Sequence, residues 1–141
     1  MTLDLHATPE EVMRAVAALQ HLCESRKIPA QIQFGLALAL EECASNIVNH
    51  ALRRDAQQQF RVTLELTAST MTIELRDSGP PFDPTLPPAA QPTADAERPP
   101  GGWGIQLVRR YIDDMRYTRD EGVNILRLTK KLIDPPANAL A

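Results

Sequence analysis

The stretch QFRVTLELTASTMTIELRD, residues 59–77, decides the fold class of this chain of 141 residues. Its apolar side chains alternate with polar ones on both sides of a break near Ala68-Ser69. A period of two is typical of a strand that buries one face and exposes the other. The stretch therefore predicts two strands joined by a short connection, as an antiparallel hairpin.

Two helical segments precede this hairpin. The first begins at the N-cap Thr8, with Glu11 completing a capping box, and its apolar residues recur at helical spacing to about residue 25. The second covers about residues 29–52. Residues 3–6 are expected to form a short strand.

The chain after the hairpin changes character twice. Residues 78–102 hold eight of the twelve prolines. Proline removes a backbone donor and fixes φ, so this stretch is expected to be a long loop, either a functional lid or a disordered linker. Residues 104 to about 115 predict a third helix, and two final strands are expected near 115–119 and 123–132.

This order of elements predicts the fold class. Strands that are not separated by single helices favour an α+β two-layer sandwich, with three main helices on one face of a mostly antiparallel sheet. We expect one domain over residues 1–133 and a flexible tail over residues 134–141.

Composition excludes several classes of protein. The formal net charge is −3 and no long run has one sign, which argues against a nucleic-acid partner. Cys23 and Cys43 lack metal-ligand spacing and are expected to be buried free thiols. No stretch approaches the ~20 apolar residues that a membrane span needs. The N-terminus has no leader pattern, so a cytoplasmic protein is expected.

A polar stripe marks the second helix. Glu42, Asn46 and His50 are spaced i, i+4, i+8, and Asn49 lies beside them. A carboxylate and an amide oxygen one turn apart suit Mg²⁺, which prefers oxygen ligands. The carboxylate can also orient or deprotonate a hydroxyl group. Taken alone, such a stripe is more often an ordinary solvated surface.

Two glycine-containing motifs follow. Asp77-Ser78-Gly79-Pro80-Pro81-Phe82-Asp83 ends the second strand of the hairpin, where the carboxylate can accept from an exocyclic amine and glycine admits a planar ring. Gly101-Gly102-Trp103-Gly104-Ile105 opens the third helix, where free N–H groups suit phosphates. An ordinary turn and a flexible hinge are the alternatives. No Walker A loop or dinucleotide fingerprint is present.

In this order, the three motifs resemble the GHKL ATPase superfamily, with its Bergerat-type ATP-binding fold, and most closely the anti-sigma factor serine/threonine-protein kinases. Glu42 to His50 is similar to the N box, Asp77 to Asp83 to the G1 box, and Gly101 to Ile105 to the G2 box. The resemblance covers about residues 8–132. Further matches to the C-terminal pattern are Leu107, Val108, Arg109, Asp113, Tyr117, Gly122, Asn124 and Lys130.

The resemblance implies roles for these residues in binding ATP and Mg²⁺. Glu42 would be the catalytic base and Asn46 the Mg²⁺ ligand. Asp77 would bind the adenine amino group, with Gly79 beside the ring and Thr129 assisting through water. The nearest candidate for the basic residue at the γ-phosphate is Arg98. The remaining members of the expected nucleotide site are Asn49, His50, Phe82, Gly101, Gly102, Trp103, Gly104 and Ile105, with Gly102 and Gly104 holding the phosphates.

The same resemblance implies partners. Family members phosphorylate a serine on an anti-sigma factor antagonist of the STAS fold and, as homodimers, sequester a sigma factor. One alternative is a nucleotide-dependent protein-binding module with little or no kinase turnover. Another is the ATP-binding part of a histidine kinase, which the positions of His6, His21 and His50 do not favour.

Overall fold

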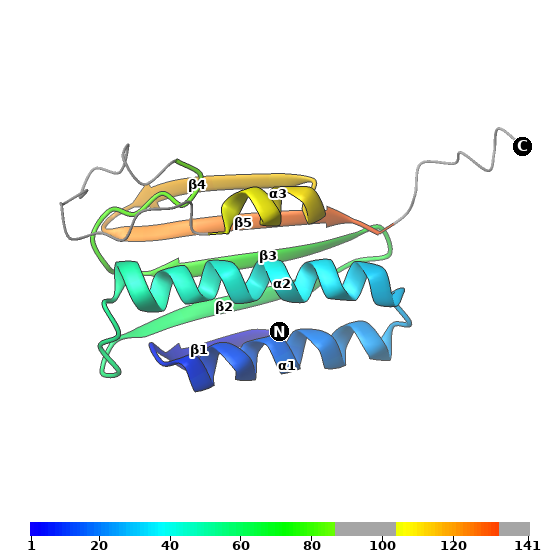
Figure 1. Ribbon diagram of the computed structural model, residues 1–141, viewed down its shortest axis with the longest axis horizontal. Coiled ribbons are helices and arrows are strands. Elements are labelled where there is room, and N and C mark those ends of the chain that lie inside the picture. Colours follow the sequence, from blue (N-terminus) through cyan, green and yellow to red (C-terminus); the bar gives the residue numbers. More distant parts are fainter. Residues whose placement is uncertain (87–103, 133–141) are drawn as a thin grey trace, which may run out of the picture.

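The computed structural model describes residues 1–86 and 104–132, which form an antiparallel sheet covered on one face by helices (Figure 1). The strand order is β1-β2-β3-β5-β4, and every neighbouring pair is antiparallel. The bounds of the strands are Thr2–His6 for β1, Gln59–Leu66 for β2, Thr70–Asp77 for β3, Asp114–Asp120 for β4 and Val123–Lys131 for β5. The predicted α+β two-layer sandwich is confirmed.

The predicted hairpin is the centre of this sheet. β2 and β3 pair from Phe60 opposite Asp77 to Leu66 opposite Met71. The apolar side chains of both strands face the helices and are mostly buried, whereas the side chains on the other face are exposed, as for Arg61 and Arg76, or half-buried. The period of two in the sequence thus separates a core face from an uncovered face.

Three α-helices lie side by side across the core face, with α1 beside β1 and α3 beside β5 (Figure 1). Their bounds are Pro9–Ser25 for α1, Ala30–Asn46 for α2 and Ile105–Tyr111 for α3. The Oγ1 atom of Thr8 accepts from the N–H of Glu11 at 3.3 Å, as predicted for the N-cap of α1. The Glu11 carboxylate accepts from the N–H of His6 at 3.2 Å. Both side chains therefore hold the chain where it enters α1.

The predicted end of the third helix is wrong, whereas the second helical segment ends near Leu52 as predicted but changes its helix type on the way. The α-helical part of α2 ends at Asn46 and continues as a π-helical turn, η1, over Ile47–Ala51, closed by the N–H of Leu52 donating to Ile47 O at 2.8 Å. The third helix ends at Tyr111 instead of near residue 115. There the chain becomes extended and joins β5, because the N–H of Asp113 donates to Thr129 O at 3.0 Å.

Helices α2 and α3 approach each other closely at Gly35. A Cβ atom on Gly35 would lie 2.7 Å from a ring carbon of Tyr111. The Tyr111 ring also packs edge-on against Phe34, with centroids 5.8 Å apart. Because the C-terminal end of α3 lies here, its N-terminal end lies further along α2, where Glu42 is located.

Cys23 and Cys43 are buried and free, as expected from the sequence. Burial raises the pKa of the Cys43 thiol to about 12, with a further contribution from Glu42. Within residues 1–86 and 104–132, no helix is long and apolar enough to cross a membrane.

Candidate functional site

The first two predicted motifs and the described end of the third, Gly104-Ile105, meet at one end of the sheet, on the face covered by helices. The C-terminal half of α2 with η1 supplies one wall, the loop after β3 a second, and the start of α3 a third. Side chains or backbone atoms of these walls are in direct contact with one another. Gly104 lies against Glu42, Gly79 lies against the Ala51 carbonyl, and the Phe82 ring stacks on the His50 ring.

Glu42 and Gly104 form the tightest of these contacts. A Cβ atom on Gly104 would fall 2.2 Å from Glu42 Oε2. Gly104 also has φ +74°, in the left-handed region that favours glycine. Burial raises the pKa of the Glu42 carboxyl, and the charge of Glu41 raises it further. The site therefore places a carboxylate with raised basicity beside an open backbone at the start of α3.

The π-helical turn sets the position of His50. A π-helix is wider than an α-helix and is found mostly as single turns at functional sites. Within this turn the His50 ring lies parallel to the Phe82 ring, at an interplanar angle of 7° with centroids 5.9 Å apart. Asn46, the last residue of α2, is only 5% exposed. Of the stripe predicted on the second helix, Asn46 is therefore buried, whereas Glu42 and His50 are half-buried.

Asp77 is a buried carboxylate at the end of β3, only 5% exposed. Its Oδ1 atom accepts from the N–H of Gly79 at 2.9 Å and from Asn124 Nδ2 at 3.0 Å. Burial raises the pKa of Asp77, and the bonds from Asn124 and Gly79 with the charge of Arg119 act in the opposite direction. The carboxylate keeps acceptor capacity beyond these two bonds.

Gly79 allows the loop after β3 to pass close to η1. A Cβ atom there would lie 2.8 Å from Ala51 O and 3.0 Å from Asp77 Oδ1. A larger residue would push the loop away from both. Gly79 is thus required here for packing on η1, and the approach of a planar ring expected from the sequence stays a prediction.

A small pocket lies between these elements. Its polar groups come from Asn46, Asp77 and Asn124, and the Phe82 ring forms part of its wall. The other lining residues are largely apolar: Cys43, Ile47, Leu75, Pro84, Tyr117 and Leu126. Apolar walls with a few convergent polar groups are the usual composition of a site for a flat organic ring. This composition suits a purine base, but the cavity, about 10 Å³, has room for no more than one water molecule in this structure, so a base would have to displace its walls.

Asn124 has a part in the site that the sequence reasoning did not assign. Its Nδ2 atom donates to Asp77 and to Pro80 O, and its Oδ1 atom accepts from Arg119 Nη1 at 2.9 Å. Asn124 is 3% exposed on β5, at an inward position followed by Leu126 and Leu128. A polar residue at the head of an inward row that continues with Leu126 and Leu128 was the feature that could have identified it.

Two residues predicted for the nucleotide site are not brought to it. Thr129 pairs with Thr72 on the uncovered face of the sheet, five residues along β5 from Asn124, which is about 17 Å for a strand. The adenine role expected for Thr129 does not fit this position, because adjacent strand residues face opposite sides and residue 124 faces inward. Asn49 is exposed and accepts from Arg54 Nε at 2.9 Å.

The other predicted residues divide into two groups. Ile105 is buried at the first position of α3, directly after Gly104. The part of the chain that contains Arg98, Gly101, Gly102 and Trp103 lies outside the described residues, as does most of the predicted lid. Since α3 has only two turns, its dipole can contribute little, and the phosphate role of this segment depends on its glycine backbone.

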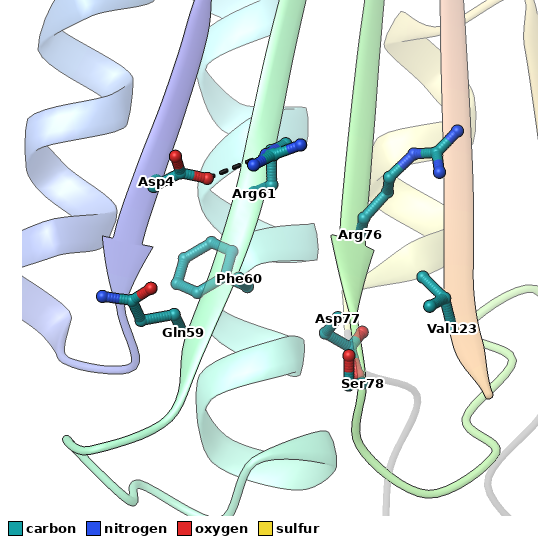
Figure 2. A pocket seen from close by; sticks show the side chains of 8 residues that line it. All are labelled: Asp4, Gln59, Phe60, Arg61, Arg76, Asp77, Ser78 and Val123. Carbon is teal, nitrogen blue, oxygen red and sulfur yellow. Dashed lines mark hydrogen bonds and ion pairs between the residues drawn. The ribbon is translucent and has the colours of Figure 1, made fainter.

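A second hollow lies on the uncovered face of the sheet (Figure 2). Arg61 and Arg76 are opposite each other in the register of β2 and β3, with the Arg76 side chain extended toward β5, and Asp4 forms an ion pair with Arg61 at 2.8 Å. The complete lining is Asp4, Gln59, Phe60, Arg61, Arg76, Asp77, Ser78 and Val123. Among the predicted site residues that the structure describes, only Asp77 borders this hollow. The candidate site therefore belongs to the covered face.

A family profile and two curated relatives match this chain and indicate the same family. The profile described as histidine kinase-like ATPase domain matches residues 5–130. The chain is 33% identical over 131 residues to the serine/threonine-protein kinase BtrW of Bordetella bronchiseptica, covering 91% of each chain. It is 25% identical over 149 residues to the serine-protein kinase RsbW of Listeria innocua, covering 100% of this chain and 95% of the relative.

A solved structure has a similar fold. It contains the RsbU and RsbW domains of Rv1364c from Mycobacterium tuberculosis, with a TM-score of 0.66 and 17% sequence identity. The match covers 96% of this chain and 33% of that longer chain. At this identity the likeness concerns the fold alone.

Proposed function

Because this chain belongs to the histidine kinase-like ATPase domain family, we propose that it is an ATP-dependent protein serine/threonine kinase. ATP would lie between α2 with η1, the loop after β3, and the start of α3. The observation that carries the proposal is the contact of Glu42 with Gly104, because it joins a carboxylate to the predicted phosphate segment. Two similar relatives are named serine or serine/threonine protein kinases, which supports the reaction class.

The base would occupy the pocket beside Asp77. The adenine amino group is a donor, and Asp77 is a buried carboxylate with an oxygen left to accept from it. Apolar side chains of the same pocket, among them Leu75 and Phe82, would contact the ring. Gly79 would lie beside the ring, in the loop that its close packing on Ala51 holds next to Asp77.

Phosphates and Mg²⁺ would lie between Asn46 and Gly104. A magnesium ion takes few protein ligands and completes its octahedron with phosphate oxygens and water. The amide oxygen of Asn46, one turn after Glu42, has the chemistry for such a ligand. When bound, the ion would neutralise charge that develops on the transferred phosphoryl group. Arg98 and the glycines at 101 and 102 are proposed to contact phosphates from the segment that precedes Gly104.

The transfer step would use Glu42 as the base. A serine hydroxyl oxygen attacks the γ-phosphorus, the bond to the ADP oxygen breaks, and the serine proton passes to the Glu42 carboxylate. Burial and the charge of Glu41 raise the pKa of Glu42, which makes it a better proton acceptor than an exposed carboxylate. The rest of the catalysis is positioning and charge neutralisation.

The partners follow from the resemblance to anti-sigma factor kinases. The acceptor serine would belong to an anti-sigma factor antagonist of the STAS fold. A sigma factor would be the second partner, released or held according to the phosphorylation of the antagonist. A homodimer of this chain is the expected assembly. A cytoplasmic location goes with these partners.

The proposal is tested by incubating the chain with Mg²⁺, γ-labelled ATP and a STAS-domain protein. We expect label on a serine of that protein with wild type and with Glu41→Gln, and its loss with Glu42→Gln. Nucleotide-dependent association without any label would instead favour a binding module. No association and no ATP binding would reject both functions.

A further inference from the structure

The side-chain amide of Asn124 has only one chemically acceptable orientation. Its nitrogen end faces acceptors: Nδ2 donates to Asp77 Oδ1 at 3.0 Å and to Pro80 O at 2.8 Å, with Gly79 O at 3.4 Å. An amide nitrogen has two hydrogens and no acceptor capacity. This end is therefore directed at the loop that follows β3.

The oxygen end of the same amide faces donors. Oδ1 accepts from Arg119 Nη1 at 2.9 Å and from the N–H of Phe82 at 3.4 Å, and the Tyr117 hydroxyl also bonds to it. Reversing the amide would set its nitrogen against these donors and its oxygen against carbonyl and carboxylate oxygens. Tyr117 and Arg119 thus fix which end Asn124 presents to Asp77.

Asn124 in turn fixes the Asp77 carboxylate. With Asn124 and the Gly79 N–H both donating to Oδ1, the plane of the carboxylate is set and Oδ2 remains for the nucleobase. Adenine carries an amino group at the position where guanine carries a carbonyl oxygen. An oriented carboxylate accepts a hydrogen bond from the amino group of adenine and repels the carbonyl oxygen of guanine. A site built to accept from a donor strongly rejects a ligand that has an acceptor at that position.

We propose that Asn124, with its oxygen end held by Tyr117 and Arg119, is a positioning residue that orients Asp77 and so sets the preference for adenine over guanine nucleotides. This inference rests on the proposed ATP site. It extends that site to β4, the edge strand that carries Tyr117 and Arg119. Arg119 also donates to Gly79 O at 3.0 Å, so the edge strand holds both Asn124 and the loop beside the base.

The experiment compares Asn124→Leu, Tyr117→Phe and Arg119→Gln with wild type for binding of ATP and GTP and for kcat and KM. Matched controls are Tyr111→Phe, another half-buried tyrosine, and Arg116→Gln, which changes an exposed arginine of the same strand ion-paired with Asp114. Thermal unfolding of every variant is recorded beside the kinetics. Tyr117→Phe is the mildest change and keeps the test valid where Asn124→Leu does not fold.

We expect the three test variants to lose ATP affinity by about tenfold or more, since bonds that involve a charged group are lost or loosened. GTP affinity should change less, so the ATP-to-GTP ratio falls, and KM for ATP should rise while kcat stays within about twofold. Arg119→Lys, which keeps a donor, should recover part of the ratio.

An unchanged ATP-to-GTP ratio, with affinity for both nucleotides falling in step with thermal stability, would show a purely structural role and overturn the inference. A wild-type chain that binds neither nucleotide would instead reject the proposed function. The two failures are therefore distinct in the same data set.

Discussion

The backbone of Gly104 lies against the carboxylate of Glu42, so closely that one added methyl group would fall 2.2 Å from Oε2. The two residues are more than sixty positions apart in the chain. Their contact joins α2 to the start of α3 and requires glycine for two reasons, the space and the positive φ. Substitutions can separate these two reasons.

Gly104→Ala should lower both stability and ATP affinity, while Gly122→Ala should lower stability alone. Both glycines have φ near +75°, at +74° and +79°, but nothing lies within 4 Å of a Cβ on Gly122. The Gly122 variant should lose about 1 kcal/mol from the left-handed conformation alone. Thermal unfolding and ATP titration measure the difference. Equal ATP affinity in the two variants would contradict the importance of the contact with Glu42.

Glu42→Gln should reduce kcat by about 10²–10⁴-fold and leave ATP affinity nearly unchanged, because a general base acts in the transfer step. In wild type, kcat should fall as the pH drops through the raised pKa of Glu42, since the ionised form is the base. Glu41→Gln removes a charge that raises this pKa, so it should move the acid limb to lower pH. Rates measured across pH test this. An acid limb that persists unchanged in Glu42→Gln would assign it to another group.

Asp77→Asn should weaken ATP binding without loss of stability at neutral pH. The new amide oxygen can still accept from Gly79 and Asn124, but the amide nitrogen replaces the oxygen that would accept from adenine. Asp55→Asn, at an exposed turn that accepts from the N–H of Gln57, is the control and should leave ATP affinity unchanged. Calorimetric titration with ATP measures both variants.

The difference in stability between Asp77→Asn and wild type should depend on pH in a defined direction. The pKa of Asp77 is raised by burial above its usual 3.8. In wild type, the stability that protonated Asp77 contributes is therefore fully present below about pH 3.8. It is lost as the pH rises through the raised pKa that Asp77 has in the folded protein. Relative to wild type, Asp77→Asn should gain stability above that window and not below it. Denaturant unfolding at several pH values would contradict this if the difference had the opposite sign.

Gly35→Ala should destabilise the chain, although alanine favours a helix interior by about 1 kcal/mol. A Cβ atom there would lie 2.9 Å from Tyr111 Cβ, near the backbone of α3, where a rotamer change gives little relief. Overpacking of this kind costs about 1–3 kcal/mol. The double variant Gly35→Ala/Tyr111→Ala keeps the Tyr111 Cβ atom but removes the ring carbons at 2.7 and 3.0 Å, so it should lose less than the sum of the single variants. Additive unfolding free energies would show that the two residues do not interact.

The fold was predictable because its main elements have strong local patterns. The alternation over residues 59–77 places the hairpin and its buried face, and the Thr8 cap places the start of α1. The gathering of Glu42, Asp77 and Gly104 followed from recognising three motifs together. None of the three contains, by itself, information on which of the others it will contact.

The remaining features depend on tertiary structure. Residues after Tyr111 have helical spacing, but from Asp114 they form β4 because they pair with β5. The third helix was therefore predicted to end several residues later than it does. The π-helical turn at Ile47 has no sequence pattern that distinguishes it from α-helix. The sequence does not show the register of β3 and β5. That register places Asn124 opposite Asp77 and Thr129 opposite Thr72, so Asn124 and not Thr129 is the neighbour of Asp77.

The central claim, a site for Mg²⁺ and ATP built on Asn46, is tested most directly by calorimetric titration with ATP in the presence and absence of Mg²⁺. We predict that wild type binds one ATP per chain more tightly with Mg²⁺. Asn46→Asp, which keeps an oxygen ligand, should retain that difference, and Asn46→Ala should lose it. Absence of ATP binding in wild type, or full Mg²⁺ dependence in Asn46→Ala, would contradict the account.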